Sequence, residues 1–208
     1  IEASPWPENG VAAAVRLKTL VPGSGHLVHM PSHIFIRTGR YAEAAEANER
    51  AIMADEKYFE CAPAPDFYNV YYLHNVHFLA YTAMMEGRYQ TAIGAARKIE
   101  KQIPQEFLQK YVTIADGFMP TSLHVLLRFG KWEEILAEPE PEKWRLFSRA
   151  EWHFARSVAL SARGKTEEAR RELKLMDEVS DEVTEEWLMG NNSAREVLAV
   201  ARNMAAGE

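Results

Sequence analysis

The sequence predicts an all-α fold built from antiparallel helix hairpins, and three observations support this prediction. A short phrase that begins with glycine and a basic residue recurs four times along the chain. Stretches with the apolar periodicity of helices lie on both sides of each copy. No alternation of apolar and polar residues with hairpin turns, the pattern typical of strands, occurs in the chain. The four copies begin at Gly39, Gly87, Gly130 and Gly164.

Each of these glycines is predicted to end the first helix of a hairpin. A residue just past a helix end commonly adopts a left-handed conformation, which glycine reaches without steric cost because it lacks a Cβ atom. Two residues later the first three copies carry an aromatic residue, which we expect to be largely buried between the paired helices. These aromatic residues are Tyr41, Tyr89 and Trp132.

The first two hairpins are predicted over about residues 25–56 and 66–102. Their helices should cover 25–38, 41–56, 66–86 and 89–102. Pro31 lies inside the first of these helices, where proline removes a backbone hydrogen bond, so we expect a tolerated kink there. The proline-rich segment 61–66 separates the two hairpins and explains their wide spacing.

The last two hairpins are predicted over about residues 117–137 and 143–178, after an extra helix at 103–117. Their helices should cover 117–129, 131–137, 143–163 and 166–178. Ser193 and Glu196 have the spacing of a capping box and predict a terminal helix over 193–205. The whole chain, 1–208, is then a single helical repeat domain.

Composition excludes several classes of function. The net charge of −6 and the pI near 5.7 leave no basic surface for nucleic acid or anionic membranes. A lone cysteine, Cys61, excludes a disulfide within the chain and a cysteine-based zinc cluster. No apolar run approaches the roughly 18 residues of a membrane span. The chain begins at Ile1 without an initiator methionine, so we expect a fragment of a longer protein, and the sequence leaves its compartment open.

The repeated phrase resembles the tetratricopeptide repeat over about residues 25–177. The last two glycines are separated by about 34 residues, the length of that repeat. The phrases GHLVHMPSHIFIRTGRY (25–41) and LHNVHFLAYTAMMEGRY (73–89) are similar to an uncharacterised bacterial family of tetratricopeptide-repeat proteins. This resemblance implies a right-handed superhelical array of hairpins, in which the first helix of each pair lines a concave groove. It also implies that repeats of the longer protein precede Ile1 and that further helix follows Glu208.

Histidines dominate the groove positions that the resemblance implies. On a helix, His26, His29 and His33 fall within an arc of about 60° and face one way. His74 and His77 take the corresponding positions in the next repeat, so imidazole rings from both helices should approach one point. The other groove residues singled out by this register are Arg37, Tyr81, Met84, His124 and Arg128. His153 falls at a packing position, where we expect a buried histidine with a hydrogen-bond partner.

Three interpretations of the five clustered histidines remain open from the sequence. They could form a nitrogen cage for Zn, Cu, Ni or Fe, although the sequence places no carboxylate beside them. They could instead shape a site for a protein or peptide, or supply a general base or a metal-bound nucleophile. Arg37 and Arg128 could also grip a small anionic ligand. We therefore predict a binding or scaffold module with a histidine-lined groove, and as the alternative a metal-dependent enzyme.

Overall fold

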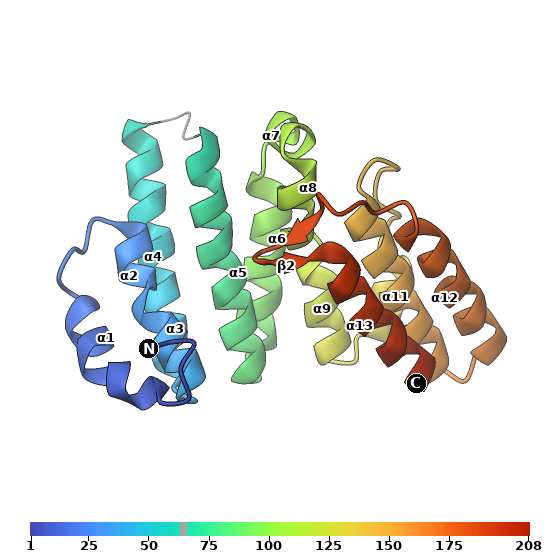
Figure 1. The fold of residues 1–208 in the computed structure, drawn as a ribbon, viewed down its shortest axis with the longest axis horizontal. Coiled ribbons are helices and arrows are strands. Elements are labelled where there is room, and N and C mark those ends of the chain that lie inside the picture. The colour runs from blue at the N-terminus through green and yellow to red at the C-terminus, as the bar shows by residue number, and fades with distance from the viewer. Residues whose placement is uncertain (63–65) are drawn as a thin grey trace. The chain divides into compact units, whose positions relative to one another are not determined.

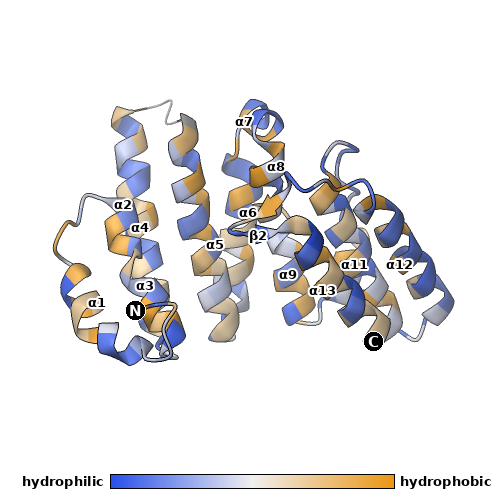
Figure 2. Cartoon of the chain, in the orientation of Figure 1, coloured by the Kyte–Doolittle hydropathy of each residue, from blue (hydrophilic) through white to orange (hydrophobic). Residues whose placement is uncertain are grey.

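The chain is almost entirely helical over the residues that the structure describes, 1–62 and 66–208 (Figure 1). This computed structural model confirms the all-α prediction. The chain divides into two compact units, Ile1–Gln102 and Ile103–Glu208. Figure 2 shows hydrophilic and hydrophobic residues sharing the same helices, as expected of amphipathic helices that bury one face. No helix in the described ranges has both the length and the apolar character needed to cross a membrane.

The first unit holds two helix pairs closed by the predicted glycines. Gly39 and Gly87 have φ angles of 72° and 73°, the left-handed conformation expected just past a helix end. Helices α2 and α3 pack against α4, α4 packs against α5, and α5 packs against α6. The elements are η1 (Pro7–Gly10), α1 (Val11–Leu17), α2 (Gly25–His29), α3 (Pro31–Arg37), α4 (Tyr41–Cys61), η2 (Asp66–Tyr68), α5 (Asn69–Met85) and α6 (Tyr89–Gln102).

In the second unit, helices also end at glycines in the left-handed conformation, and a short strand pair is added. Gly130 and Gly164 also have positive φ angles, 63° and 74°. The extra helix expected over 103–117 is split into two short helices and a 3-10 turn. The elements are α7 (Gln105–Lys110), α8 (Val112–Ala115), η3 (Asp116–Phe118), α9 (Thr121–Arg128), α10 (Trp132–Ala137), α11 (Leu146–Ala162), α12 (Thr166–Ser180), β1 (Leu188–Met189), β2 (Asn192–Ser193) and α13 (Ala194–Gly207).

Several boundaries differ from the predicted ones for local reasons. The first predicted helix is broken at Met30, because Pro31 cannot continue the hydrogen-bond ladder, and it becomes α2 and α3. Ser193 precedes α13 as predicted, but its side chain makes no capping hydrogen bond. Strands β1 and β2 are too short to leave an alternating pattern in the sequence. Part of the proline-rich segment, residues 63–65, lies outside the described residues.

The core is rich in alanine, and the hairpin aromatics are less buried than we expected. Tyr41, Tyr89 and Trp132 are only half-buried. Each is the first residue of its helix, where fewer neighbouring turns surround the side chain than in a helix interior. Alanines with no exposed surface, such as Ala44 in α4, make the close helix contacts instead. His153 is buried as predicted, and its Nδ1 atom lies 2.7 Å from Oε2 of Glu172.

Candidate metal centre in the first helical unit

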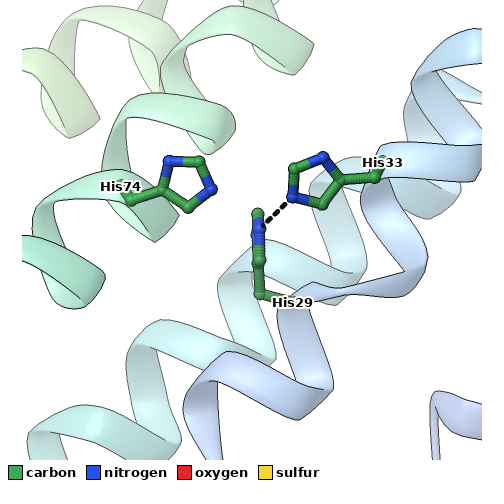
Figure 3. A group of neighbouring side chains, drawn as sticks. All are labelled: His29, His33 and His74. Carbon is green, nitrogen blue, oxygen red and sulfur yellow. Dashed lines mark hydrogen bonds between the residues drawn. The ribbon is translucent and has the colours of Figure 1, made fainter. Parts of the chain in front are cut away.

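Three histidines from three helices converge on one point in the first unit (Figure 3). They are His29 at the end of α2, His33 in the first turn of α3 and His74 in α5. One ring nitrogen from each lies within 4.8 Å of the nitrogens of the other two. His29 is fully buried, and the other two are half-buried. This spacing suits three ligands of a single metal ion.

The break at Met30 and the packing of α2 explain why the rings meet. Residues four apart lie about one helical turn from each other, so His29 and His33 still share a face across the short interruption. Their Nε2 atoms are 2.8 Å apart. Helix α2 also contacts both α4 and α5, and its contact with α5 brings His74 to the same point. The rings of His29 and His74 have centroids 4.6 Å apart.

Two outer side chains fix the orientation of the first two rings. Nδ1 of His29 lies 2.7 Å from Oδ1 of Asn48, whose own amide nitrogen donates to the carbonyl oxygen of Ala44. Since Oδ1 of Asn48 can only accept, Nδ1 of His29 carries the proton and its Nε2 atom presents a lone pair. Nδ1 of His33 lies 2.6 Å from Oε1 of Glu2, which accepts from it in the same way. Histidines that bind metals are typically held by such partners on their second nitrogen.

The short contact between the two Nε2 atoms suits a shared cation. With Nδ1 of both rings donating outward, two neutral rings would point lone pairs at each other across 2.8 Å. A metal ion bound by both nitrogens would remove this repulsion. The two Nε2 atoms are therefore placed to share one metal ion.

Burial keeps two of the three rings neutral near pH 7. The pKa of His29 is lowered to about 3, mainly by burial and further by the charges of His74, His33 and His26. The pKa of His74 is lowered to about 4, again mainly by burial and then by His33 and His26. Neutral imidazole is the form that binds metal ions. Both rings can therefore bind a metal ion at physiological pH without losing a proton.

An aromatic ring closes one side of the cluster. Phe78 lies one turn after His74 in α5, and its ring centroid is 4.7, 4.6 and 4.5 Å from those of His29, His33 and His74. A ring in contact with all three histidines excludes water from that side. The low local dielectric strengthens electrostatic interactions with any bound ion.

The structure separates the other two predicted ligands from this cluster. The nitrogens of His26 and His77 do not belong to the set within 4.8 Å. His26 is stacked against His29, with ring centroids 6.0 Å apart, and it also meets Tyr71 edge to face. His77 is half-buried, three residues beyond His74 on α5. The structure thus brings together three of the five candidate ligands.

The remaining predicted groove residues fall in both units. In the first unit Arg37 is exposed and donates to the carbonyl oxygen of Ser4, while Tyr81 is 39% exposed and Met84 is half-buried. In the second unit Arg128 is exposed. Nε2 of His124 lies 3.1 Å from Oε2 of Glu151, a carboxylate with only 2% of its side chain exposed.

Two residues at the site were missed by sequence reasoning. Glu2 and Asn48 hold the rings of His33 and His29. Glu2 lies far from the histidines in sequence, so no local motif could indicate it. Asn48 is completely buried in α4, and a polar residue among alanines at a core position was the available signal.

Acidification should destabilise the metal-free protein through these histidines. The unfolded protein has histidine pKa values near 6.5, above those of folded His29 and His74, so it binds more protons between about pH 6.5 and 4. The stability contributed by the neutral rings is complete above about pH 6.5. It should fall below that pH by up to about 1.4 kcal/mol per pH unit for each histidine.

Urea denaturation of the chelator-treated protein between pH 7.5 and 4.5 measures this effect. His74→Gln is the control, since it removes one of the two histidines and leaves the other acid-titrating groups in place. Its stability should fall less steeply with acidification than that of the parent. Equal slopes for the two proteins would mean that His74 is not held neutral by the fold.

Comparison with protein-family models, with curated proteins and with solved structures gives no match for this chain. The resemblance to tetratricopeptide repeats, and the superhelical array that it implies, therefore stay predictions.

Proposed function

We propose that the chain is a helical binding module that holds one transition metal ion through His29, His33 and His74. The observation that carries this proposal is the convergence of three ring nitrogens within 4.8 Å. The outward hydrogen bonds of His29 and His33 support it, because they leave both Nε2 atoms directed inward. The expectation of five histidine ligands is narrowed to these three.

The ligand set indicates the class of metal. Imidazole nitrogens suit Zn, Cu, Ni and Fe, whereas Mg and Ca prefer oxygen ligands. Two nitrogens on one tetrahedral zinc ion lie about 3.4 Å apart, given Zn–N bonds of about 2.0–2.1 Å. The Nε2 atoms of His29 and His33, now 2.8 Å apart, would need to separate by only about half an ångström. A side-chain adjustment of that size leaves the helices in place.

A protein or peptide ligand is the second candidate, favoured by the exposed face of α5. Tyr71, Tyr81 and Met85 lie on one side of this helix together with His74 and Phe78, by their spacing of three and four residues. The first three are 41%, 39% and 38% exposed. Exposed aromatic and methionine side chains are enriched in protein interfaces. A partner docked on this face would contact the metal centre, as expected for a binding module in which the metal assists.

Metal stoichiometry tests the metal-binding proposal. The chelator-treated protein is mixed with excess Zn²⁺, freed of loose metal by gel filtration and analysed by native mass spectrometry and elemental analysis. We expect one zinc ion per chain and a rise in the thermal midpoint, because a ligand that binds only the folded state stabilises it. A chain that retains no zinc and melts at an unchanged temperature would rule out the proposal.

A further inference from the structure

We infer that the bound ion keeps one exchangeable coordination position, and that this position takes a small monoanion held also by His26. This inference rests on the proposed metal site and adds a ligand class to it. It assigns His26 a role different from the metal ligation that the sequence suggested.

The number of protein ligands leaves room for an exogenous one. A tetrahedral ion needs four ligands, and the described residues bring three nitrogens to the point. Sites with three protein ligands characteristically keep water or substrate in the fourth position, whereas structural sites use four. His33, with a side chain that is 17% exposed, and the half-buried His74 leave the cluster partly open to solvent, so a ligand of a few atoms can approach on that side.

The charge of the site favours an anion there. Three neutral imidazoles leave both positive charges of a divalent ion uncompensated. Among the described residues, Glu2 is the carboxylate that is hydrogen-bonded to a ligand ring, that of His33. The side chain of Glu2 is 49% exposed. Glu2 therefore offsets the charge only from outside and in contact with solvent. A buried charge is costly unless it is paired. A monoanion bound directly to the metal ion is therefore strongly stabilised by its charge.

His26 offers this anion a second contact. Its Nδ1 atom is buried and has no hydrogen-bond partner among the described residues. The ring stacks on His29, and it lies near enough to His74 that its charge would lower the pKa of that ring. A buried polar atom without a partner costs free energy that a suitable ligand recovers. An anion on the ion beside His29 can accept a hydrogen bond from Nδ1 of His26 in its Nδ1-protonated tautomer.

The nearby carboxylate of Asp55 does not prevent an anion from binding beside His26. It interacts electrostatically with His26, but its two carboxylate oxygens accept hydrogen bonds from Tyr68 and Asn75.

Azide titration of the Co²⁺-loaded full chain tests the inference. Cobalt replaces zinc in nitrogen sites and has a visible spectrum that reports its ligands. We expect a Co²⁺ spectrum before azide is added, and then a saturable change on adding azide. His26→Phe should retain one Co²⁺ per chain but bind azide about tenfold more weakly, as for loss of one hydrogen bond to a charged group. His77→Phe is the matched control and should bind azide like the parent.

Each outcome decides a different claim. A Co²⁺ spectrum that ignores azide, or His26→Phe that binds azide like the parent, would overturn the inference and leave the metal site standing. Absence of a Co²⁺ spectrum before azide is added would overturn the metal site and this inference with it. His26→Leu serves as a second variant if phenylalanine disturbs the fold, which circular dichroism would reveal. The azide response of the parent protein decides the exchangeable position without any variant.

Discussion

Replacing His74 with alanine should abolish tight zinc binding. The substitution removes one of three ligands, and the two that remain, His29 and His33, leave the ion mainly to solvent. Changes to the outer partners of metal ligands typically cost 10- to 100-fold in affinity, so loss of a ligand should cost at least about 100-fold. At a zinc concentration of 100 times the parent's dissociation constant, the metal-dependent stabilisation should fall from about 2.7 kcal/mol to about 0.4 kcal/mol or less.

His77→Ala is the matched control for this variant. It changes the same residue type on the same helix, three residues away, and its nitrogens are outside the converging set. Competition titration with a chromogenic chelator measures both affinities. We expect His77→Ala to bind zinc within a few-fold of the parent. Equal losses in the two variants would show that zinc does not distinguish these histidines, contrary to the geometry.

Replacing Gly25 with alanine should destabilise the first unit severely. A Cβ atom at Gly25 would lie 1.8 Å from Oδ1 and 2.3 Å from Cγ of Asp55. The Asp55 side chain is only 1% exposed and is held by Tyr68 and Asn75, so it cannot turn away without breaking buried hydrogen bonds. Overpacking combined with loss of a buried polar network should cost about 3 kcal/mol or more.

Gly94→Ala provides the opposite expectation in the same unit. Gly94 is an exposed residue within α6, and a Cβ atom there would meet nothing within 4 Å. Alanine favours helix over glycine by about 0.5–1 kcal/mol, so this variant should be slightly more stable than the parent. Urea denaturation midpoints of the two variants and the parent measure these changes in stability. A Gly25→Ala midpoint within error of the parent would mean that α2 does not pack against Asp55 as described.

The helical fold was accessible from the sequence because its key signals are local. Gly39, Gly87, Gly130 and Gly164 each end a helix for a reason confined to one residue, and all four adopt the expected left-handed conformation. Helix α1 and the strand pair β1–β2 depend instead on tertiary contacts, which leave no pattern in the local sequence. The N-terminal helix α1 has no strong start or stop signal. The strand pair β1 and β2 depends on two residues in each strand.

The site was predictable only where it depends on a single helix face. His29 and His33 share a face by spacing alone, and the repeat register placed His74 opposite them. The same register could not separate His74 from His77, because three residues along a helix rotate a side chain by about 60° from a full turn. Nor could it reveal Glu2, which reaches His33 from the N-terminal segment through tertiary packing.

X-ray absorption at the zinc edge of the reconstituted protein tests the central claim most directly. The geometry of His29, His33 and His74 predicts three imidazole nitrogens at about 2.0–2.1 Å from the ion, with one further oxygen or nitrogen ligand that is not imidazole. The multiple-scattering signature of imidazole should weaken by about one third in His74→Ala if that protein is forced to bind zinc. A first shell with fewer than three imidazoles, or a sulfur ligand from Cys61, would contradict this three-histidine site.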